Sequence, residues 1–125
     1  MARHNDLGTW GEQMAVDYLE SKGYTVRDRN KSFKKDELDI VAISPDGTEL
    51  VFIEVKTRTS EEFQEPELAV DRRKIRNLGR AADDYLKREA MEMYARFDII
   101  TIVGTIGCTS PIITHLEDVP LYNRI

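Results

Sequence analysis

Hydrophobic residues recur at helical spacing in two stretches of the chain. In the first, from about Asp6 to Lys22, apolar residues return every three or four positions, and Gly23 supplies a typical helix end. The second stretch begins near Asp71, a suitable N-cap, and runs to about Ala90. The pattern predicts two amphipathic helices, each with one buried face. The apolar positions are Leu7, Trp10, Met14 and Tyr18, then Ile75, Leu78, Ala82, Tyr85 and Leu86.

Five shorter stretches have the alternating or continuous apolar pattern of β-strands. The stretch Phe97–Val103 is nearly continuously apolar, as expected of a central strand that is covered on both faces. The last stretch is expected at an edge of the sheet. In chain order the strands cover about Tyr24–Asn30, Glu37–Ile43, Glu49–Thr57, Phe97–Val103 and Pro111–Leu116.

The segments between these elements have the composition of turns and loops. Lys31–Asp36 is a polar loop, Ser44–Gly47 contains the turn signal Pro-Asp-Gly, and Thr59–Val70 is polar and acidic. The resulting order, α-β-β-β-α-β-β, predicts an α/β or α+β domain with a mixed sheet flanked by helices. No repeat or linker interrupts it, so residues 1–125 are expected to form a single domain.

The second and third strands bring charged residues together. If Asp46 and Gly47 form a two-residue turn, Asp39 pairs directly with Glu54 across the hairpin, with their Cβ atoms about 5 Å apart on one face. Lys56, two residues beyond Glu54, points to the same face. Any loop of even length keeps these side chains together, whereas an odd loop or a bulge would separate them.

Two opposed carboxylates repel each other and call for a compensating charge. Lys56 is one candidate, and a divalent cation is another, because Mg²⁺ is bound through one or two carboxylates together with water and phosphate oxygens. Such an ion activates a water and neutralises charge on a phosphodiester, while a lysine stabilises the charge that develops. The alternative interpretation is an ion-pair cluster on a half-exposed sheet, although charges inside apolar strands are costly unless paired or functional.

Composition narrows the function classes. The 125 residues are 41% hydrophobic and 33% charged, with no apolar run of membrane-spanning length and no signal-peptide pattern at the start. The single cysteine, Cys108, excludes an internal disulfide, and a reducing cytoplasmic setting is expected. The net charge of −5 counts against a simple nucleic-acid binder, but a bound cation reverses the local field of an acidic site.

The ordered set of motifs resembles the bacterial UPF0102 (YraN) family within the PD-(D/E)XK nuclease superfamily, and it is similar to archaeal Holliday-junction resolvases. The resemblance implies a restriction-endonuclease-like three-layer α/β fold and Mg²⁺- or Mn²⁺-dependent cleavage of DNA, with branched DNA as a candidate substrate. It also implies that Asp39 and Glu54 bind the metal, that Lys56 is the catalytic lysine and that Glu12 assists from the first helix. The matching segments are Gly8-x-x-Gly11-Glu12-x-x-Ala15, Tyr18-Leu19, Gly23-Tyr24, Asn30, Glu37-Leu38-Asp39-Ile40, Phe52-Ile53-Glu54-Val55-Lys56-Thr57-Arg58, Lys74 and Arg96-Phe97-Asp98.

Glu12 also has a structural interpretation. Thr9 and Glu12 have the spacing of a capping box, in which Glu12 would bond back to the Thr9 amide at the start of the helix. If the helix begins nearer Asp6, this interpretation fails.

Several basic residues are candidates for contact with DNA phosphates, where each contact adds salt-dependent affinity. A solvated helix face and a solubilising loop are the alternatives, because Asp83 and Asp84 interrupt the basic stripe of the second helix. The candidates are Arg58 after the catalytic strand, Lys34 and Lys35 in the loop before Asp39, and Arg72, Lys74 and Arg76 on the second helix.

Two further functions remain open from the sequence. One is a nucleic-acid-binding module of the same fold that does not cleave, and the other is a protein-interaction domain that docks a partner through the acidic loop between Glu61 and Glu67. A junction-cleaving enzyme would need two sites and hence a homodimer. His115 is expected to be structural or exposed, and Asp98 to cap or pair locally.

Overall fold

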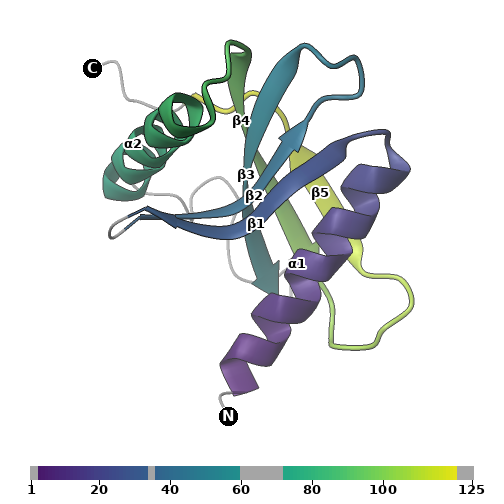
Figure 1. Ribbon diagram of the computed structural model, residues 1–125. Helices are drawn as coiled ribbons and strands as arrows, with labels where there is room; N and C mark the ends of the chain where they lie inside the picture. Colours follow the sequence, from purple (N-terminus) through teal and green to yellow (C-terminus); the bar gives the residue numbers. More distant parts are fainter. Residues whose placement is uncertain (1–2, 34–35, 60–71, 121–125) are drawn as a thin grey trace.

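The computed structural model describes residues 3–33, 36–59 and 72–120 (Figure 1). The order α-β-β-β-α-β-β is confirmed. The elements are α1 (Arg3–Ser21), β1 (Thr25–Phe33), β2 (Asp36–Ile43), β3 (Glu49–Arg58), α2 (Arg72–Glu89), β4 (Tyr94–Val103) and β5 (Ile112–Leu116).

The five strands form one mixed sheet in the order β1-β2-β3-β4-β5. Neighbouring strands are antiparallel except β3 and β4, which are parallel. A parallel pair needs a crossover connection, and α2 lies in the one between β3 and β4.

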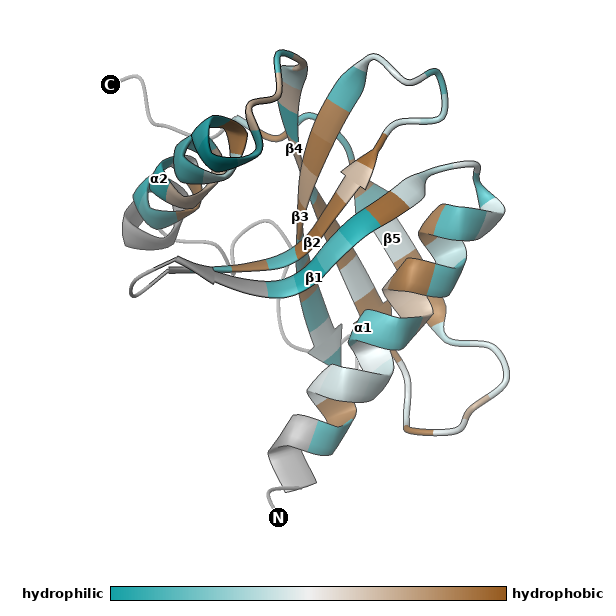
Figure 2. Cartoon of the chain, viewed as in Figure 1, coloured by the Kyte–Doolittle hydropathy of each residue, from teal (hydrophilic) through white to brown (hydrophobic). Residues whose placement is uncertain are grey.

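The two helices cover opposite faces of the sheet (Figure 1). Ile40 and Ala42 of β2 pack in the cluster that contains α1, whereas Val41 between them packs in the cluster that contains α2. This alternation buries strand residues on both sides, and Figure 2 shows hydrophobic residues concentrated in β2, β3 and β4. The result is the three-layer, restriction-endonuclease-like fold expected from the sequence. None of the helices in the described residues combines the length and apolarity that crossing a membrane requires.

The strand boundaries differ from prediction where backbone pairing extends a strand into polar sequence. The predicted loop Lys31–Asp36 is shorter, because β1 and β2 remain paired as far as Phe33 and Asp36. Similarly, β4 begins at Tyr94 rather than Phe97, because its first residues pair with the start of β3 although Tyr94 itself is exposed. Periodicity of side chains does not report such extensions.

The register of the β2–β3 hairpin is the predicted one, although the turn is wider. The recorded pairs run from Ile43↔Leu50 to Ile40↔Ile53, with the spacing that the two-residue turn implied. The turn is instead closed by Ser44, whose N–H donates to the Glu49 carbonyl at 2.9 Å. Four residues therefore lie within the turn in place of two, and the even number preserves the register. The Asp46 carboxylate accepts hydrogen bonds from the side chains of Ser44 and Thr48 and holds this wider turn.

Candidate functional site

A pocket of about 570 Å³ lies between the first half of α1 and strands β1, β2 and β3. Its volume is within the usual range for ligand sites. The polar residues that line it are Thr9 and Glu12 from α1, Asn30 from β1, Glu37 and Asp39 from β2, and Lys56 and Thr57 from β3. Three of the four residues that the sequence singled out for chemistry are thus brought together.

Glu12 lies in the middle of α1 and is 8% exposed. Its Oε1 accepts a hydrogen bond from Asn30 Nδ2 at 3.0 Å, and Arg29 Nη2 lies 3.8 Å from the same oxygen. Its Oε2 is buried and has no hydrogen-bond partner within the described part of the chain. The capping interpretation is wrong, because α1 begins at Arg3 and Thr9 is therefore inside the helix.

Asp39 is tied to the neighbouring strand through its side chain. Its Oδ2 accepts a hydrogen bond from the Val55 N–H at 2.9 Å. The recorded β2–β3 pairs end one step earlier, at Ile40↔Ile53. The carboxylate therefore takes up a backbone donor of β3 just beyond the end of the recorded ladder, and this fixes Asp39 at the wall of the pocket.

The alternation of side chains in β2 slips at Asp39. Ile40 packs on the α1 side, and strict alternation would put Leu38 there too, but Leu38 packs with Val41 in the α2 cluster. Asp39 itself lines the pocket beside α1 rather than continuing the α2 side. The prediction that Asp39 and Glu54 lie on one face of the hairpin assumed strict alternation of side chains along β2. The side chains of Leu38 and Asp39 depart from that alternation.

Glu54 is buried next to Lys56 and outside the main pocket. It is 4% exposed, and its Oε2 is 3.4 Å from Lys56 Nζ. Glu54 lines a small cavity on the α2 side together with Phe52 and Leu78, whereas Lys56 lines the main pocket. The lysine therefore connects the buried acid to the pocket that contains Glu12 and Asp39.

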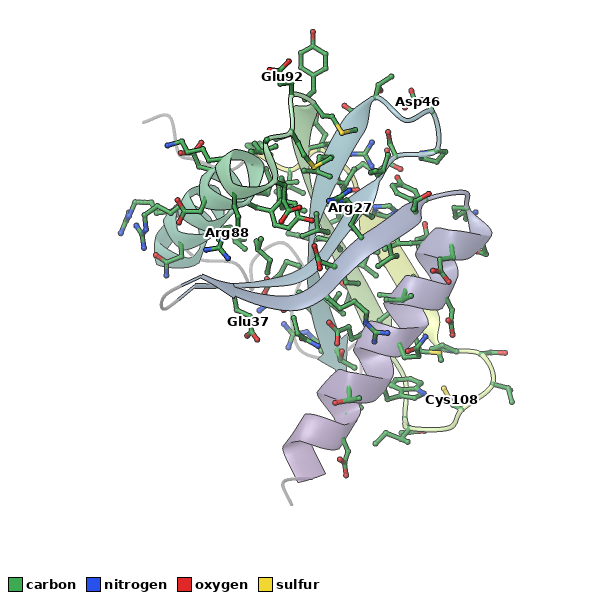
Figure 3. All side chains as sticks on the ribbon, viewed as in Figure 1. Arg27, Glu37, Asp46, Arg88, Glu92 and Cys108 are labelled. Atoms are coloured by element: carbon green, nitrogen blue, oxygen red, sulfur yellow. The ribbon has the colours of Figure 1, made fainter. Side chains whose placement is uncertain are left out.

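Glu37 and Asn30 were given no role from the sequence. Glu37 is exposed, and in Figure 3 it projects from the β1–β2 hairpin away from α2. The sequence feature that could have identified Glu37 is its position two residues before Asp39 on the same strand. Asn30 is also among the residues that carry the family resemblance, but the resemblance gave it no role, because its contribution depends on a backbone φ of 50° that side-chain periodicity does not reveal.

The candidate DNA contacts are described only in part. Arg58 ends β3 next to the pocket, and its Nε is buried without a hydrogen-bond partner among the described residues. Arg76 is exposed on α2. Lys34 and Lys35, the side chains of Arg72 and Lys74, and the acidic loop between Glu61 and Glu67 lie outside the described residues.

Two other basic residues of α2, Arg80 and Lys87, contact neighbours on the same helix. Arg80 donates to Asn77 at 2.6 Å, and Lys87 pairs with Asp83 at 3.3 Å. Both contacts are typical of a solvated helix face.

A second polar cluster surrounds Asp98 on β4. Arg96 donates to both carboxylate oxygens, at 2.9 and 2.8 Å, and His115 Nε2 donates to Oδ2 at 2.7 Å. His115 Nδ1 is hydrogen-bonded to the Tyr18 hydroxyl at 3.0 Å, which links β5 to α1. His115 is therefore structural, which is one of the two alternatives expected from the sequence. Asp98 pairs locally with Arg96, as expected, and also over long range with His115.

These contacts set the ionisation of the cluster. Burial acts to raise the pKa of Asp98, yet the hydrogen bonds from His115 and Arg96 hold that pKa below its ordinary value. The hydrogen bonds to Asp98 likewise raise the pKa of Arg96. The cluster is thus a charged structural lock, and none of its residues lines the main pocket.

Residues 11–102 match the profile of the uncharacterised protein family UPF0102. A UPF0102 protein of Bacteroides thetaiotaomicron is 50% identical over 107 residues, which cover 86% of this chain and 87% of that protein. A UPF0102 protein of Phocaeicola vulgatus is 46% identical over 118 residues, 94% of each chain. A UPF0102 protein of Christiangramia forsetii is 38% identical over 122 residues, 98% of this chain and 99% of that one.

Proposed function

The chain belongs to the uncharacterised protein family UPF0102, and we propose that it is a metal-dependent endonuclease that hydrolyses DNA phosphodiester bonds. The observation that carries the proposal is the second carboxylate oxygen of Glu12. This oxygen is buried, has no hydrogen-bond partner among the described residues, and belongs to a residue that lines the pocket with Asp39 and Lys56. A buried acceptor without a donor costs about 1–3 kcal/mol, and more when charged, so a ligand that satisfies it is favoured.

The donors of the pocket fit a hard divalent cation. Carboxylate oxygens are the ligands that Mg²⁺ and Mn²⁺ prefer. Among the described residues, no group of three or more histidine, cysteine, aspartate or glutamate side chains has the spacing of a closed metal cage. A Mg²⁺ site needs only one or two protein carboxylates, because water and phosphate oxygens complete its shell.

Asp39 would hold the ion, and Glu12 would assist from α1. Glu54 lines the neighbouring cavity on the α2 side, so its carboxylate would have to turn toward this pocket to act as the second ligand. When bound, a divalent ion lowers the pKa of a coordinated water and neutralises charge on the scissile phosphate. Asp39 is already held in place by the Val55 N–H, so little reorientation is required of it. Lys56, close to Glu54, presents a positive charge to the pocket, where it would stabilise the negative charge that develops on the phosphorus oxygens.

Basic residues of the chain would hold the DNA. Arg58 follows Lys56 on β3, and Arg76 offers an exposed charge on α2, with Lys34, Lys35, Arg72 and Lys74 as further candidates. If the substrate is branched DNA, two strands must be cut, and a homodimer would supply the two sites. We place this activity in the cytoplasm, where Cys108 would stay reduced.

The test is a cleavage assay with purified protein on linear and branched DNA, with Mg²⁺, with Mn²⁺ and with a chelator. We expect cleavage that requires the metal and that falls at least a hundredfold in a Lys56→Ala variant. Lys87→Ala is the matched control, because Lys87 is an exposed lysine on α2 whose recorded partner is Asp83. Absence of cleavage by the wild type, or equal cleavage by Lys56→Ala, would refute the proposal.

Two other outcomes of the same experiment identify the alternatives. Salt-dependent DNA binding without cleavage, unchanged by Asp39→Asn, would indicate a binding module of the same fold. Absence of any DNA binding at low salt would favour a protein-interaction domain.

A further inference from the structure

Asn30 has an unusual backbone conformation for a residue within a strand. Its φ is 50°, in the left-handed region, and among the described residues it is the only non-glycine residue inside a strand with a positive φ. Asparagine tolerates this region better than most residues, because its short polar side chain makes local hydrogen bonds. Residues held in such a conformation cost free energy and are concentrated at functional sites.

The first effect is on the direction of side chains in β1. Consecutive strand residues normally point to opposite faces of the sheet. Here Arg29 donates to Gln13 of α1 at 3.1 Å, and the next residue, Asn30, donates to Glu12 of the same helix at 3.0 Å. The left-handed step therefore turns two successive side chains toward α1.

The second effect is on the paired strand. The recorded pairs Arg29↔Ile40 and Lys31↔Leu38 flank the position where Asn30 stands opposite Asp39. This is the step at which the alternation of β2 slips, with Leu38 on the α2 side and Asp39 at the pocket. The irregularity of β1 and the reorientation of Asp39 thus coincide in one cross-strand step.

From these observations we propose that Asn30 is a positioning residue for the candidate site. Its amide holds Oε1 of Glu12 and so leaves Oε2 for the pocket, and its backbone opens the pleat so that Asp39 faces the same pocket. The inference rests on the proposed function, because the chemistry that Asn30 serves is the binding of a cation and a phosphodiester by Glu12 and Asp39.

Asparagine combines a tolerated left-handed backbone with a side-chain donor for Glu12. Glycine would keep the left-handed backbone but would lose the donor to Glu12. Aspartate also tolerates this conformation, but its carboxylate would repel Glu12. The two substitutions therefore separate the backbone contribution from the hydrogen bond.

The test compares Asn30→Gly with the wild type in melting temperature, in the rise of melting temperature on adding Mn²⁺, and in kcat and KM for DNA cleavage. We expect a folded protein in which kcat falls about tenfold to a hundredfold, as for groups that orient metal ligands, and the Mn²⁺-induced rise shrinks. KM for DNA should change little, because Asn30 is not proposed to grip the strand. Asp17→Asn is the control, since Asp17 lies on the exposed face of α1 and its hydrogen-bond partner is Gln13 rather than Glu12 or Arg29.

A double-variant cycle identifies the route of the effect. If Asn30 acts through Glu12, Asn30→Gly should cost little further activity in a Glu12→Gln background. Asn30→Asp should lose at least as much activity as Asn30→Gly, because its carboxylate would repel Glu12 instead of donating a hydrogen bond to it. Additive losses in the double variant, or wild-type activity and metal response in Asn30→Gly, would overturn the inference while leaving the nuclease proposal standing. If the wild type neither cleaves DNA nor responds to metal, the proposed function fails first, and the inference falls with it.

Discussion

Two buried carboxylates of this protein differ in how their oxygens are satisfied. Both oxygens of Asp98 accept hydrogen bonds, from Arg96, from His115 and from the Asp118 N–H. Glu12 has one bonded oxygen and one without a partner among the described residues. A fully bonded buried acid serves stability, whereas an acid left incomplete beside a pocket is the kind of group that function retains.

The fully bonded acid gives a prediction at the residue scale. Asp98→Asn leaves the Arg96 guanidinium without its buried counter-charge, and breaking such a pair costs about 3–5 kcal/mol. We expect the free energy of unfolding in urea at pH 7 to fall by about that amount. Asp17→Asn, on the exposed face of α1, should change it by less than about 0.5 kcal/mol.

The contribution of Asp98 should also appear in the pH dependence of the free energy of unfolding. The pKa of Asp98 is depressed in the folded protein, so its contribution is complete above the ordinary aspartate pKa of about 3.9 and is lost as pH falls through the lower folded pKa. Wild-type stability should therefore decline more steeply below about pH 5 than that of Asp98→Asn. Parallel curves for the two proteins would contradict the role given to this acid.

At the scale of elements, α1 contains two glycines with different surroundings. A Cβ on Gly11 would lie 2.1 Å from Thr57 Oγ1 and 2.9 Å from Thr57 Cβ, whereas a Cβ on Gly8 would meet nothing within 4 Å. Gly11 therefore lets α1 approach β3 closely and sets the depth at which Glu12 enters the pocket. Gly8, also at the pocket, has no such packing requirement among the described residues.

Alanine at the two positions should have opposite effects on stability. Gly8→Ala removes a helix-interior glycine and should raise the free energy of unfolding by up to about 1 kcal/mol. Gly11→Ala forces the helix away from Thr57 and should lower it by about 1–3 kcal/mol despite the better helix propensity. Urea denaturation of both variants checks this, and equal stabilisation by both would show that α1 does not depend on the contact at Gly11.

The elements also show how far the sequence could predict the site. Helical spacing and strand pattern were sufficient for the element order, and the register of the β2–β3 hairpin followed from the even number of residues in its turn. The slip at Asp39 could not be predicted, because it arises from a left-handed residue on the neighbouring strand. The buried lock around Asp98 was also beyond the pattern, since its partners come from α1, β4 and β5.

At the scale of the whole molecule, the net charge of −5 opposes the approach of DNA. A divalent cation at the pocket would reverse that field locally. We therefore expect Mg²⁺ or Mn²⁺ to raise the melting temperature by mass action, by an amount equivalent to about 2.7 kcal/mol at a hundred times Kd.

A thermal melt across a metal titration measures this effect. Asp39→Asn should abolish the rise, and Asp17→Asn, which removes the same charge from the exposed face of α1, should keep it. An equal rise in all three proteins would mean that the metal binds elsewhere.

The most direct test of the central claim is the single-turnover rate of DNA cleavage in Mg²⁺, compared for the wild type, Asp39→Asn and Asp17→Asn. The wild type and Asp17→Asn are predicted to cleave at similar rates, and Asp39→Asn at least a thousandfold more slowly, because it loses charge where the cation would bind. Cleavage by Asp39→Asn at the wild-type rate, or no cleavage by any of the three proteins, would contradict the assignment of this pocket as a nuclease site.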